Sequence, residues 1–318
     1  MTKPRDSLKR QTVIGVDLGG TKCAAGLVSL PDGNVLARRL EPTRPERGGE
    51  AVLSSVVELA KSLERQAAEL NHSVAAIGLG VAELVGIDGQ VLSDATIRWR
   101  GIAVRENLEA ATGLAVTIDA DVRAAARAEA HLGAGRRFRS FQYITVGTGI
   151  SSCLVIDRMP YAGARGLTGT FASSAGLIPA DDGTLAAGPP LEQFAAGPAL
   201  ATRLAAVRRD FTGTAFDVVA AAEEGDLAAA GIVESAGSAL GAAIGQLVNV
   251  LDPEAVVIGG GLGLAGGKYR AALEAAMRNS IWSELHRDVA LLNAEMGTDA
   301  GFIGATLAAV ANEQRNRA

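Results

Sequence analysis

VIGVDLGGTKCAAGLV, residues 13–28, consists of two apolar runs that are separated by a glycine-rich turn. A third run, NVLARRLEP, follows the turn at Pro31-Asp32-Gly33. Short apolar runs bounded by turn residues are typical of β-strands. The opening of the chain therefore predicts three antiparallel strands joined by two tight turns.

Helical and strand patterns alternate after this opening. Residues 50–70 carry apolar side chains at spacings of three and four, which predicts an amphipathic helix. Residues 141–163, FQYITVGTGISSCLVIDRMPYAG, then repeat the opening design of strand, glycine-rich turn and strand. The economical interpretation is an internally duplicated β-β-β-α-β-α architecture. We expect residues 174–190, which are rich in Gly, Pro and Asp, to form a surface loop, and residues 191–251 to be mostly helical.

Length and composition exclude several classes of protein. The chain has 318 residues, 48% of them hydrophobic, and 30 Lys and Arg against 35 Asp and Glu give a net charge of −5. This balance argues against a nucleic-acid-binding or disordered chain. Two cysteines are too few for a disulfide framework, and no segment has the roughly 20 uninterrupted apolar residues needed to span a bilayer. We expect a cytoplasmic protein without nucleic-acid or membrane partners.

The first glycine-rich turn is a candidate phosphate site. Its glycines allow backbone N–H groups to face an anion without obstruction by a Cβ atom, and Asp17 can hold a hydrated Mg²⁺ ion. A tight hairpin explains the two glycines equally well, so both interpretations stay open. Lys22 either contacts phosphate or faces solvent. The turn is not a P-loop, because the strand leads to another strand rather than to a helix.

Two further glycine-rich turns strengthen the phosphate interpretation. TVGTGISS, residues 145–152, lies at the equivalent place in the second half, and two such hairpins can clamp a polyphosphate. VIGGG, residues 257–261, ends a buried strand and permits a planar group such as adenine to approach, although a packing role is the alternative. The candidate nucleotide-binding residues are Asp17, Gly19, Gly20, Thr21, Lys22, Gly147, Thr148, Gly149, Gly259, Gly260 and Gly261.

In this order, the motifs resemble the ROK family of bacterial sugar kinases and sugar-responsive repressors. DADVRAAARAEAHLGAGR, YAGARG, FAAGPAL and LDPEAVVIGGG also carry the resemblance, which covers residues 12–313. It implies an α/β, two-domain ribonuclease-H-like (actin-like ATPase) fold with an interdomain cleft. The implied domains are residues 1–122, completed by a C-terminal helix at 301–318, and residues 123–300. The resemblance also implies ATP, Mg²⁺, a small-molecule substrate and a homodimer.

The resemblance implies that Asp121 is the catalytic base. The family has a segment similar to ENDxNAAALGE, and its aspartate matches Asp121 when Glu129 is aligned on the final glutamate. A carboxylate near a helix N-terminus stays ionised and can accept the proton of the acceptor hydroxyl. The alternative is that Asp121 only caps the helix.

The departures from the family pattern lie on the substrate side. The two asparagines beside the base are Ala120 and Arg123, and Thr170 and Ser173 stand where the family has a sugar-binding glutamate and a histidine. Losing several hydroxyl readers changes the substrate, so we do not expect plain glucose. Arg123 and Arg98 suggest an acidic or already phosphorylated substrate. The alternative is that both are solvated surface arginines or pair with Asp119 and Glu83. The candidate substrate residues are Glu83, Thr96, Ala120, Asp121, Arg123, Thr170 and Ser173.

The family's structural zinc site is not expected. Its three cysteine positions are occupied by Gly183, Leu185 and Pro190, and thiolates are the ligands of such a site.

The sequence thus predicts an ATP-dependent kinase, a transferase of carbohydrate metabolism that phosphorylates a hydroxyl of a sugar or sugar-like molecule. The alternative is a non-catalytic, ROK-type ligand-binding or sensor protein without a DNA-binding domain. Polyphosphate remains possible as the phosphoryl donor.

Overall fold

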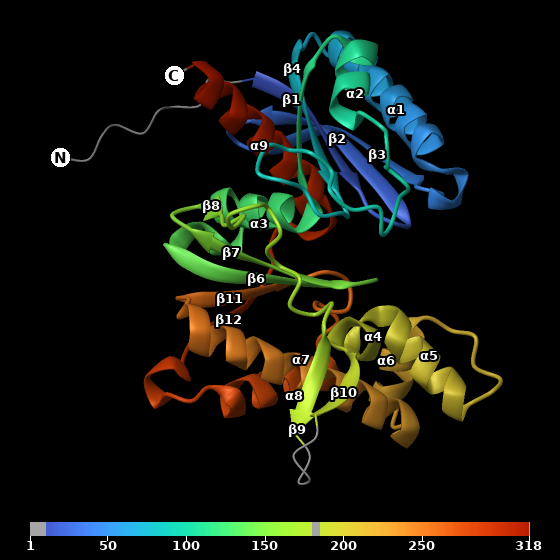
Figure 1. The fold of residues 1–318 in the computed structure, drawn as a ribbon. Coiled ribbons are helices and arrows are strands. Elements are labelled where there is room, and N and C mark those ends of the chain that lie inside the picture. The colour runs from blue at the N-terminus through green and yellow to red at the C-terminus, as the bar shows by residue number, and fades with distance from the viewer. Residues whose placement is uncertain (1–10, 180–184, 318) are drawn as a thin grey trace. The chain divides into compact units, whose positions relative to one another are not determined.

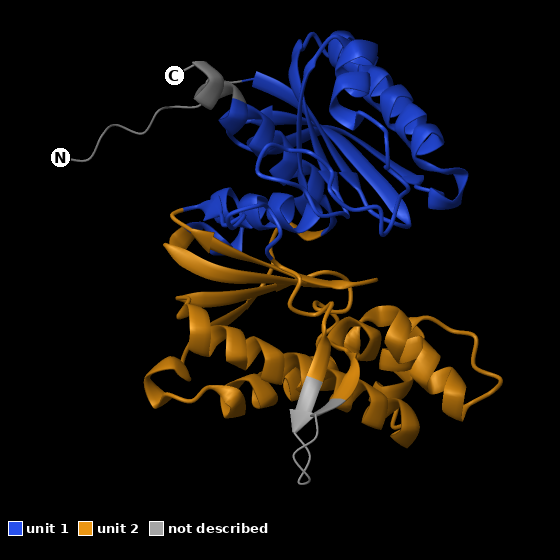
Figure 2. Cartoon of the chain, in the orientation of Figure 1, with its two compact units in different colours: residues 1–136, 158–168, 298–318 blue, residues 137–157, 169–297 orange. Residues whose placement is uncertain are grey.

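The computed structural model describes residues 11–179 and 185–317 of the chain. These residues form two units, which Figure 2 distinguishes by colour. Unit 1 contains residues 1–136, 158–168 and 298–318, and unit 2 contains residues 137–157 and 169–297. Each unit is built around a β-sheet, as the predicted duplication requires.

Unit 1 has a five-stranded sheet in the order β3-β2-β1-β4-β5 (Figure 1). The strands are β1 (Gln11–Leu18), β2 (Lys22–Leu30), β3 (Asn34–Pro42), β4 (Val74–Val81) and β5 (Ala115–Ala120). The first three are antiparallel, which confirms the prediction, and β4 and β5 run parallel to β1. The remaining elements are η1 (Pro45–Arg47), α1 (Gly49–Glu69), α2 (Val104–Thr112), α3 (Asp121–His131), η2 (Ala134–Arg137), β8 (Met159–Pro160), η4 (Gly297–Asp299) and α9 (Ala300–Arg317).

Small residues allow α9 to lie directly on the sheet of unit 1. A Cβ atom on Gly15 would stand 2.0 Å from the carbonyl oxygen of Phe302, and one on Gly78 would stand 2.0 Å from that of Ala305. On the helix, Gly304 approaches the carbonyl of Ala124 in α3 equally closely. Glycine at these positions therefore brings backbone against backbone, and the C-terminal helix becomes part of unit 1.

Unit 2 contributes the sheet order β12-β11-β6-β7. Its strands are β6 (Ser140–Val146), β7 (Ile150–Ile156), β11 (Ala255–Gly259) and β12 (Ala290–Asn293), and a separate hairpin is formed by β9 (Ala175–Pro179) and β10 (Leu185–Pro190). β6 and β7 are antiparallel, whereas β11 is parallel to both of its neighbours. Its helices are α4 (Leu191–Ala195), α5 (Gly197–Val207), α6 (Ala215–Glu223), α7 (Leu227–Leu251), α8 (Gly267–Ser280) and η3 (Glu284–His286).

Helix α7 packs against α8 through a glycine ridge. Gly237, Gly241 and Gly245 repeat at a spacing of four, and Cβ atoms there would come within 2.1–2.7 Å of backbone oxygens of α8. Among the described residues, α7 is the one helix long and apolar enough to cross a membrane. This is weak evidence for a membrane span, because a core helix meets the same criteria. Here α7 contributes Leu240 and Ile244 to the buried core of unit 2.

One expectation differs from the structure. The predicted surface loop at 174–190 contains the β9–β10 hairpin, in which Leu177 pairs with Ala187. Backbone pairing does not require apolar alternation, so the Gly- and Pro-rich sequence concealed it. The contacts place α3 in unit 1, where it packs against α9. The predicted division into two functional domains remains a prediction.

Candidate active site

Two carboxylates stand at one edge of the sheet in unit 1. Asp17 lies near the end of β1, in register with Gly80 of β4, and Gly80 is in register with Asp119 of β5. Asp121 follows β5 directly as the first residue of α3. Because β1, β4 and β5 are parallel, their carboxyl ends meet at the same edge. The first turn of α9 borders this edge, since a Cβ atom on Gly301 would be 2.2 Å from Oδ2 of Asp17.

Burial makes both carboxyl groups unusually weak acids. It raises the pKa of Asp17 to about 7, and the nearby charge of Asp121 adds to the effect. Burial is also the main cause that raises the pKa of Asp121 to about 6. The charges of Glu83 and Asp119 raise it further, whereas Arg123 and the Val122 N–H, 2.6 Å from Oδ1, lower it. At neutral pH Asp121 is therefore mostly ionised, with a pKa suited to general base catalysis.

Asp121 is not the N-cap of α3. Ala120 occupies that position and provides no side-chain cap. The alternative in which Asp121 serves only to cap the helix therefore lacks its hydrogen bond, and the carboxylate is held by the adjacent Val122 N–H instead.

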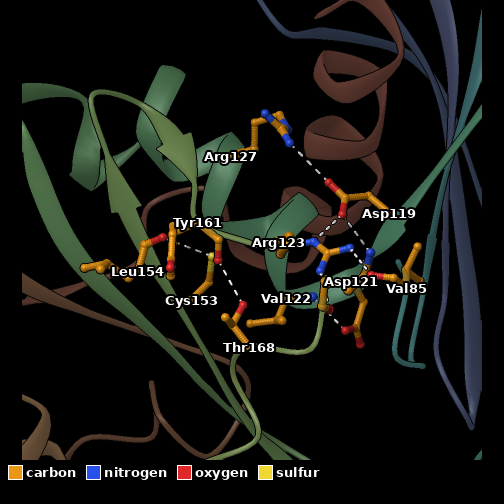
Figure 3. Close-up of polar contacts among 12 residues, drawn as sticks. Val85, Asp119, Asp121, Val122, Arg123, Arg127, Cys153, Leu154, Tyr161 and Thr168 are labelled. Carbon is orange, nitrogen blue, oxygen red and sulfur yellow. Dashed lines mark hydrogen bonds and ion pairs between the residues drawn. The ribbon is translucent and has the colours of Figure 1, made fainter. Parts of the chain in front are cut away.

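Arg123 is fully engaged with the protein (Figure 3). Its Nε donates to Oδ1 of Asp119 at 2.5 Å, and its two terminal nitrogens donate to the carbonyls of Gly166 and Val85 at 2.8 Å each. The side chain is buried. The pairing of Arg123 with Asp119, one of the open alternatives, is confirmed, and each nitrogen of the guanidinium group already donates one hydrogen bond to the protein.

Glu83 organises a loop rather than pairing with an arginine. Its carboxylate accepts hydrogen bonds from the backbone N–H groups of residues 95–97 at 2.7–3.0 Å and from the hydroxyl of Ser93. Thr96 in this loop donates to the Ala82 carbonyl at 3.0 Å. Its methyl group lies 2.7 Å from where a Cβ atom on Gly20 would be, so the loop abuts the first glycine-rich turn.

The first glycine-rich turn is a closed hairpin. The N–H of Gly19 donates to the Lys22 carbonyl at 3.0 Å, and the hydroxyl of Thr43 donates to the Gly19 carbonyl at 2.6 Å. The hairpin interpretation is thus confirmed, and the phosphate interpretation stays a prediction. Thr21 and Lys22 are exposed.

The other two glycine-rich turns come together in unit 2. β6 and β11 are parallel neighbours in which Thr145 is in register with Gly259, so the turns that follow them lie at the same edge. The Val146 carbonyl accepts from the N–H groups of Leu262 and Gly263 at 3.0 and 3.1 Å. Gly260 has φ +79°, which favours glycine. The N–H of Gly197, where α5 begins, donates to the Gly147 carbonyl at 2.9 Å.

Two residues that the sequence did not single out border these turns. The Glu192 carboxylate accepts from the Ile150 N–H at 2.8 Å and lies 2.6 Å from where a Cβ atom on Gly149 would be. Phe216 of α6 is 60% exposed, and the edge of its ring is 3.1 Å from where a Cβ atom on Gly261 would be. No local pattern identifies either residue, because only the tertiary packing brings them to the turns.

The proposed substrate residues are divided between the units. Glu83, Thr96, Ala120 and Arg123 accompany Asp121 in unit 1, whereas Thr170 and Ser173 are exposed residues of one turn in unit 2. The Ser173 N–H closes that turn by donating to the Thr170 carbonyl at 3.0 Å. Ala120 is buried.

Within residues 11–179 and 185–317, no three or more His, Cys, Asp or Glu side chains form a group that could hold a metal ion. Gly183 and Leu185 occupy two of the positions where the family has zinc-binding cysteines. The structure does not describe Gly183 or the side chain of Leu185, so the absence of a zinc site stays a prediction. The Asp17–Asp121 pair does fit Mg²⁺, because this ion keeps several waters and needs only one or two carboxylates.

Known proteins resemble this chain over nearly its whole length. The model of the ROK family matches residues 13–312. The chain is 30% identical to the glucokinase of Streptomyces coelicolor, over 92% of this chain and 95% of that protein. It is 29% identical to the N-acetylmannosamine kinase of Salmonella arizonae, over 94% of this chain and 98% of that protein.

A solved structure with the same fold contains a nucleotide analogue. It is the ROK family glucokinase of Streptomyces griseus in complex with glucose and AMPPNP. It superposes with a TM-score of 0.77 at 27% identity, over 94% of this chain and 99% of that chain. The likeness confirms the predicted α/β fold of the ribonuclease-H-like, actin-like ATPase class.

Proposed function

The chain belongs to the ROK family, and we propose that it is an ATP-dependent kinase that phosphorylates a hydroxyl of a sugar or sugar-like molecule. The observation that carries this proposal is the pair of buried carboxylates, Asp17 and Asp121, at the carboxyl edge of the sheet in unit 1. Two buried carboxyl groups with elevated pKa values at one edge of a sheet are typical of acid–base and metal-binding centres. Relatives that are named glucokinase and N-acetylmannosamine kinase support the reaction class.

In this proposal Asp121 accepts the proton of the acceptor hydroxyl. Its pKa of about 6 lets it stay ionised at neutral pH while it remains basic enough to take the proton. Asp17 holds hydrated Mg²⁺, whose charge relieves the repulsion between the two carboxylates. Bound ATP supplies the phosphoryl group, and bound Mg²⁺ neutralises charge on the phosphates.

The nucleotide side of the proposal rests on the glycine-rich turns. Gly19, Gly20, Thr21 and Lys22 in unit 1, and the turns at 147–149 and 259–261 in unit 2, are the proposed contacts. A Cβ atom on Gly147 would meet nothing within 4 Å, whereas Gly149 faces the carboxylate of Glu192. A phosphate is therefore better received at Gly147 and Thr148. We assign adenine to Gly261, where the exposed ring of Phe216 offers a stacking face.

The substrate is proposed to differ from plain glucose. Ala120 is buried and has no side-chain hydrogen-bonding group, and the three nitrogens of the buried Arg123 guanidinium group each donate to Asp119, Val85 or Gly166. The same bonds argue against a substrate that needs the charge of Arg123. Neutral or N-acylated sugars therefore rank ahead of acidic ones. The proposal also includes a homodimer, which the family resemblance supports, and a cytoplasmic setting, which the low number of cysteines supports.

The test measures ADP release with Mg²⁺ and ATP across a panel of hexoses, N-acetylhexosamines, acidic sugars and polyols. The wild type is compared with Asp121→Asn and with Asp94→Asn, which removes an exposed carboxylate of the same unit. Turnover on one sugar class that disappears in Asp121→Asn and persists in Asp94→Asn would support the proposal. Activity that survives in Asp121→Asn would refute the assignment of the base.

The non-catalytic alternative is distinguished in the same experiment. Ala120, Thr170 and Ser173 are the residues that favour it, because they lack the hydroxyl-reading groups of the family. Calorimetric binding of AMPPNP without turnover on any sugar would support a ligand-binding protein. Replacement of ATP by polyphosphate in a parallel assay tests the donor.

A further inference from the structure

We propose that unit 1 contains a second binding site, specific for the phosphate group of a small molecule, on the side of α3 that carries Arg127. A cavity of about 240 Å³ opens there, bordered by the 86–89 loop, α3 and α9. None of the glycine-rich turns lines it, and neither Asp17 nor Asp121 does. In Figure 3 the Arg127 guanidinium and the Asp121 carboxylate lie on opposite sides of the Asp119–Arg123 pair. The inference does not depend on the proposed function.

The first observation is a buried donor that lacks an acceptor. Arg127 lines the cavity and is only 9% exposed. Its Nη2 donates to Oδ2 of Asp119 at 3.1 Å, but its Nε is buried and has no hydrogen-bond partner among the described residues. Leaving a buried donor unsatisfied costs about 1–3 kcal/mol, more when it is charged. Arg127 therefore brings to the wall of the cavity a guanidinium group that its contact with Asp119 does not fully satisfy.

A second arginine repeats the arrangement from a different helix. Arg105 of α2 lines the same cavity, and its Nη2 donates to the Asp88 carbonyl at 2.6 Å. Its Nε is also buried without a partner among the described residues. Two guanidinium groups that converge on one cavity from separate elements provide the forked donors that suit phosphate oxygens.

The charge of the cavity favours an anion. Its lining includes three guanidinium groups, from Arg105, Arg123 and Arg127, and two carboxylates, from Asp88 and Asp119. Both oxygens of Asp119 already accept from arginines, and Oδ1 also accepts from the Ala120 N–H at 2.9 Å. One positive charge therefore remains uncompensated by the lining. Inorganic phosphate and a small sugar phosphate share the chemistry that this cavity would recognise.

The experiment titrates inorganic phosphate into the full-length protein by calorimetry. Arg127→Gln removes the central donor, and Arg105→Gln, whose side chain donates to the Asp88 carbonyl of the loop, keeps the test informative if the first variant folds poorly. Each is expected to weaken phosphate binding at least tenfold, as the loss of a charge-assisted hydrogen bond requires. Arg98→Gln, an exposed arginine outside the cavity, should leave the affinity unchanged, and Lys22→Gln reports any phosphate that is bound at the first glycine-rich turn.

The possible outcomes separate clearly. Absence of phosphate binding by the wild type would overturn the proposal, and so would binding that both cavity variants retain. Loss of binding in Lys22→Gln alone would assign the phosphate to the glycine-rich turn and also overturn it. A parallel titration with glucose 6-phosphate identifies the source. If glucose 6-phosphate binds more tightly than inorganic phosphate and Arg105→Gln abolishes that binding, the site is assigned to sugar phosphates. If the two ligands bind with equal affinity, the site is assigned to free phosphate.

Discussion

Replacement of Asp17 by Asn should stabilise the protein, and the gain should grow as the pH rises. Burial raises the pKa of Asp17 from 3.8 to about 7, so the folded state holds this proton where the unfolded state has lost it. A carboxyl group of this kind makes unfolding easier as the pH increases from about 4 to about 7. Asparagine has a similar shape and does not titrate, so the variant escapes this loss.

The magnitude follows from the two pKa values. Between pH 5 and pH 8, a shift from 3.8 to about 7 lowers the free energy of unfolding of the wild type by at most about 3 kcal/mol. The advantage of Asp17→Asn should increase by about 2–3 kcal/mol over the same interval. Any cost of burying the amide is the same at both pH values and cancels in this difference.

The assay is urea unfolding at pH 5 and pH 8 in the absence of nucleotide and divalent ions. Glu58→Gln, on the exposed face of α1, controls for the loss of a surface carboxylate. Asp121→Asn and the double variant complete a double-mutant cycle, which measures the interaction between the two carboxylates. The cycle is informative because the charge of Asp121 contributes to the raised pKa of Asp17. An advantage of Asp17→Asn that is equal at pH 5 and pH 8 would refute the idea that this carboxylate is desolvated. Addition of Mg²⁺ should favour the wild type over the variant if Asp17 holds the ion.

Three further outcomes are expected. Phe216→Ala should raise the KM for ATP about tenfold, as the loss of one stacking contact predicts, while the KM for the sugar stays unchanged and Phe216→Tyr behaves as the wild type. Gly304→Ala should destabilise the protein by about 3 kcal/mol or more in urea unfolding, because its Cβ would lie 1.7 Å from a backbone oxygen. The control Gly231→Ala, which meets nothing within 4 Å on an exposed helix face, should instead stabilise by about 0.5–1 kcal/mol. Glu83→Ala should speed hydrogen exchange of the amides at 95–97, because they lose their shared acceptor. Unchanged exchange rates would show that the loop keeps its structure without the Glu83 carboxylate.

The fold could be predicted because its signals are local. Apolar runs interrupted by Gly-Gly or Asp-Gly identify strands and turns, and their repetition in the second half reveals the duplication. The β9–β10 hairpin escaped prediction, since its pairing is a backbone property and its composition resembles that of a loop. The close approach of α3 to α9 could not be predicted either, because it joins segments about 180 residues apart.

Some residues of the candidate site could be predicted from the sequence, and others could be identified only from the tertiary structure. The sequence could nominate Asp17, Asp121 and the glycine-rich turns, since each belongs to a short motif. It left open whether Arg123 faces a substrate or pairs with Asp119, and only the buried geometry decided for the pair. Phe216 and Glu192 could not be found from their neighbours along the chain.

The sequence by itself determined which chemical groups this protein carries, the order of its strands and helices outside the β9–β10 hairpin, and the family to which it belongs. Those properties depend on side-chain type and on spacings of a few residues. The tertiary structure alone decided which carboxylates repel one another, which arginine is already satisfied, and where a guanidinium N–H remains without an acceptor. These are properties of distance and solvent exclusion between segments far apart in the chain, and electrostatic energies depend on both.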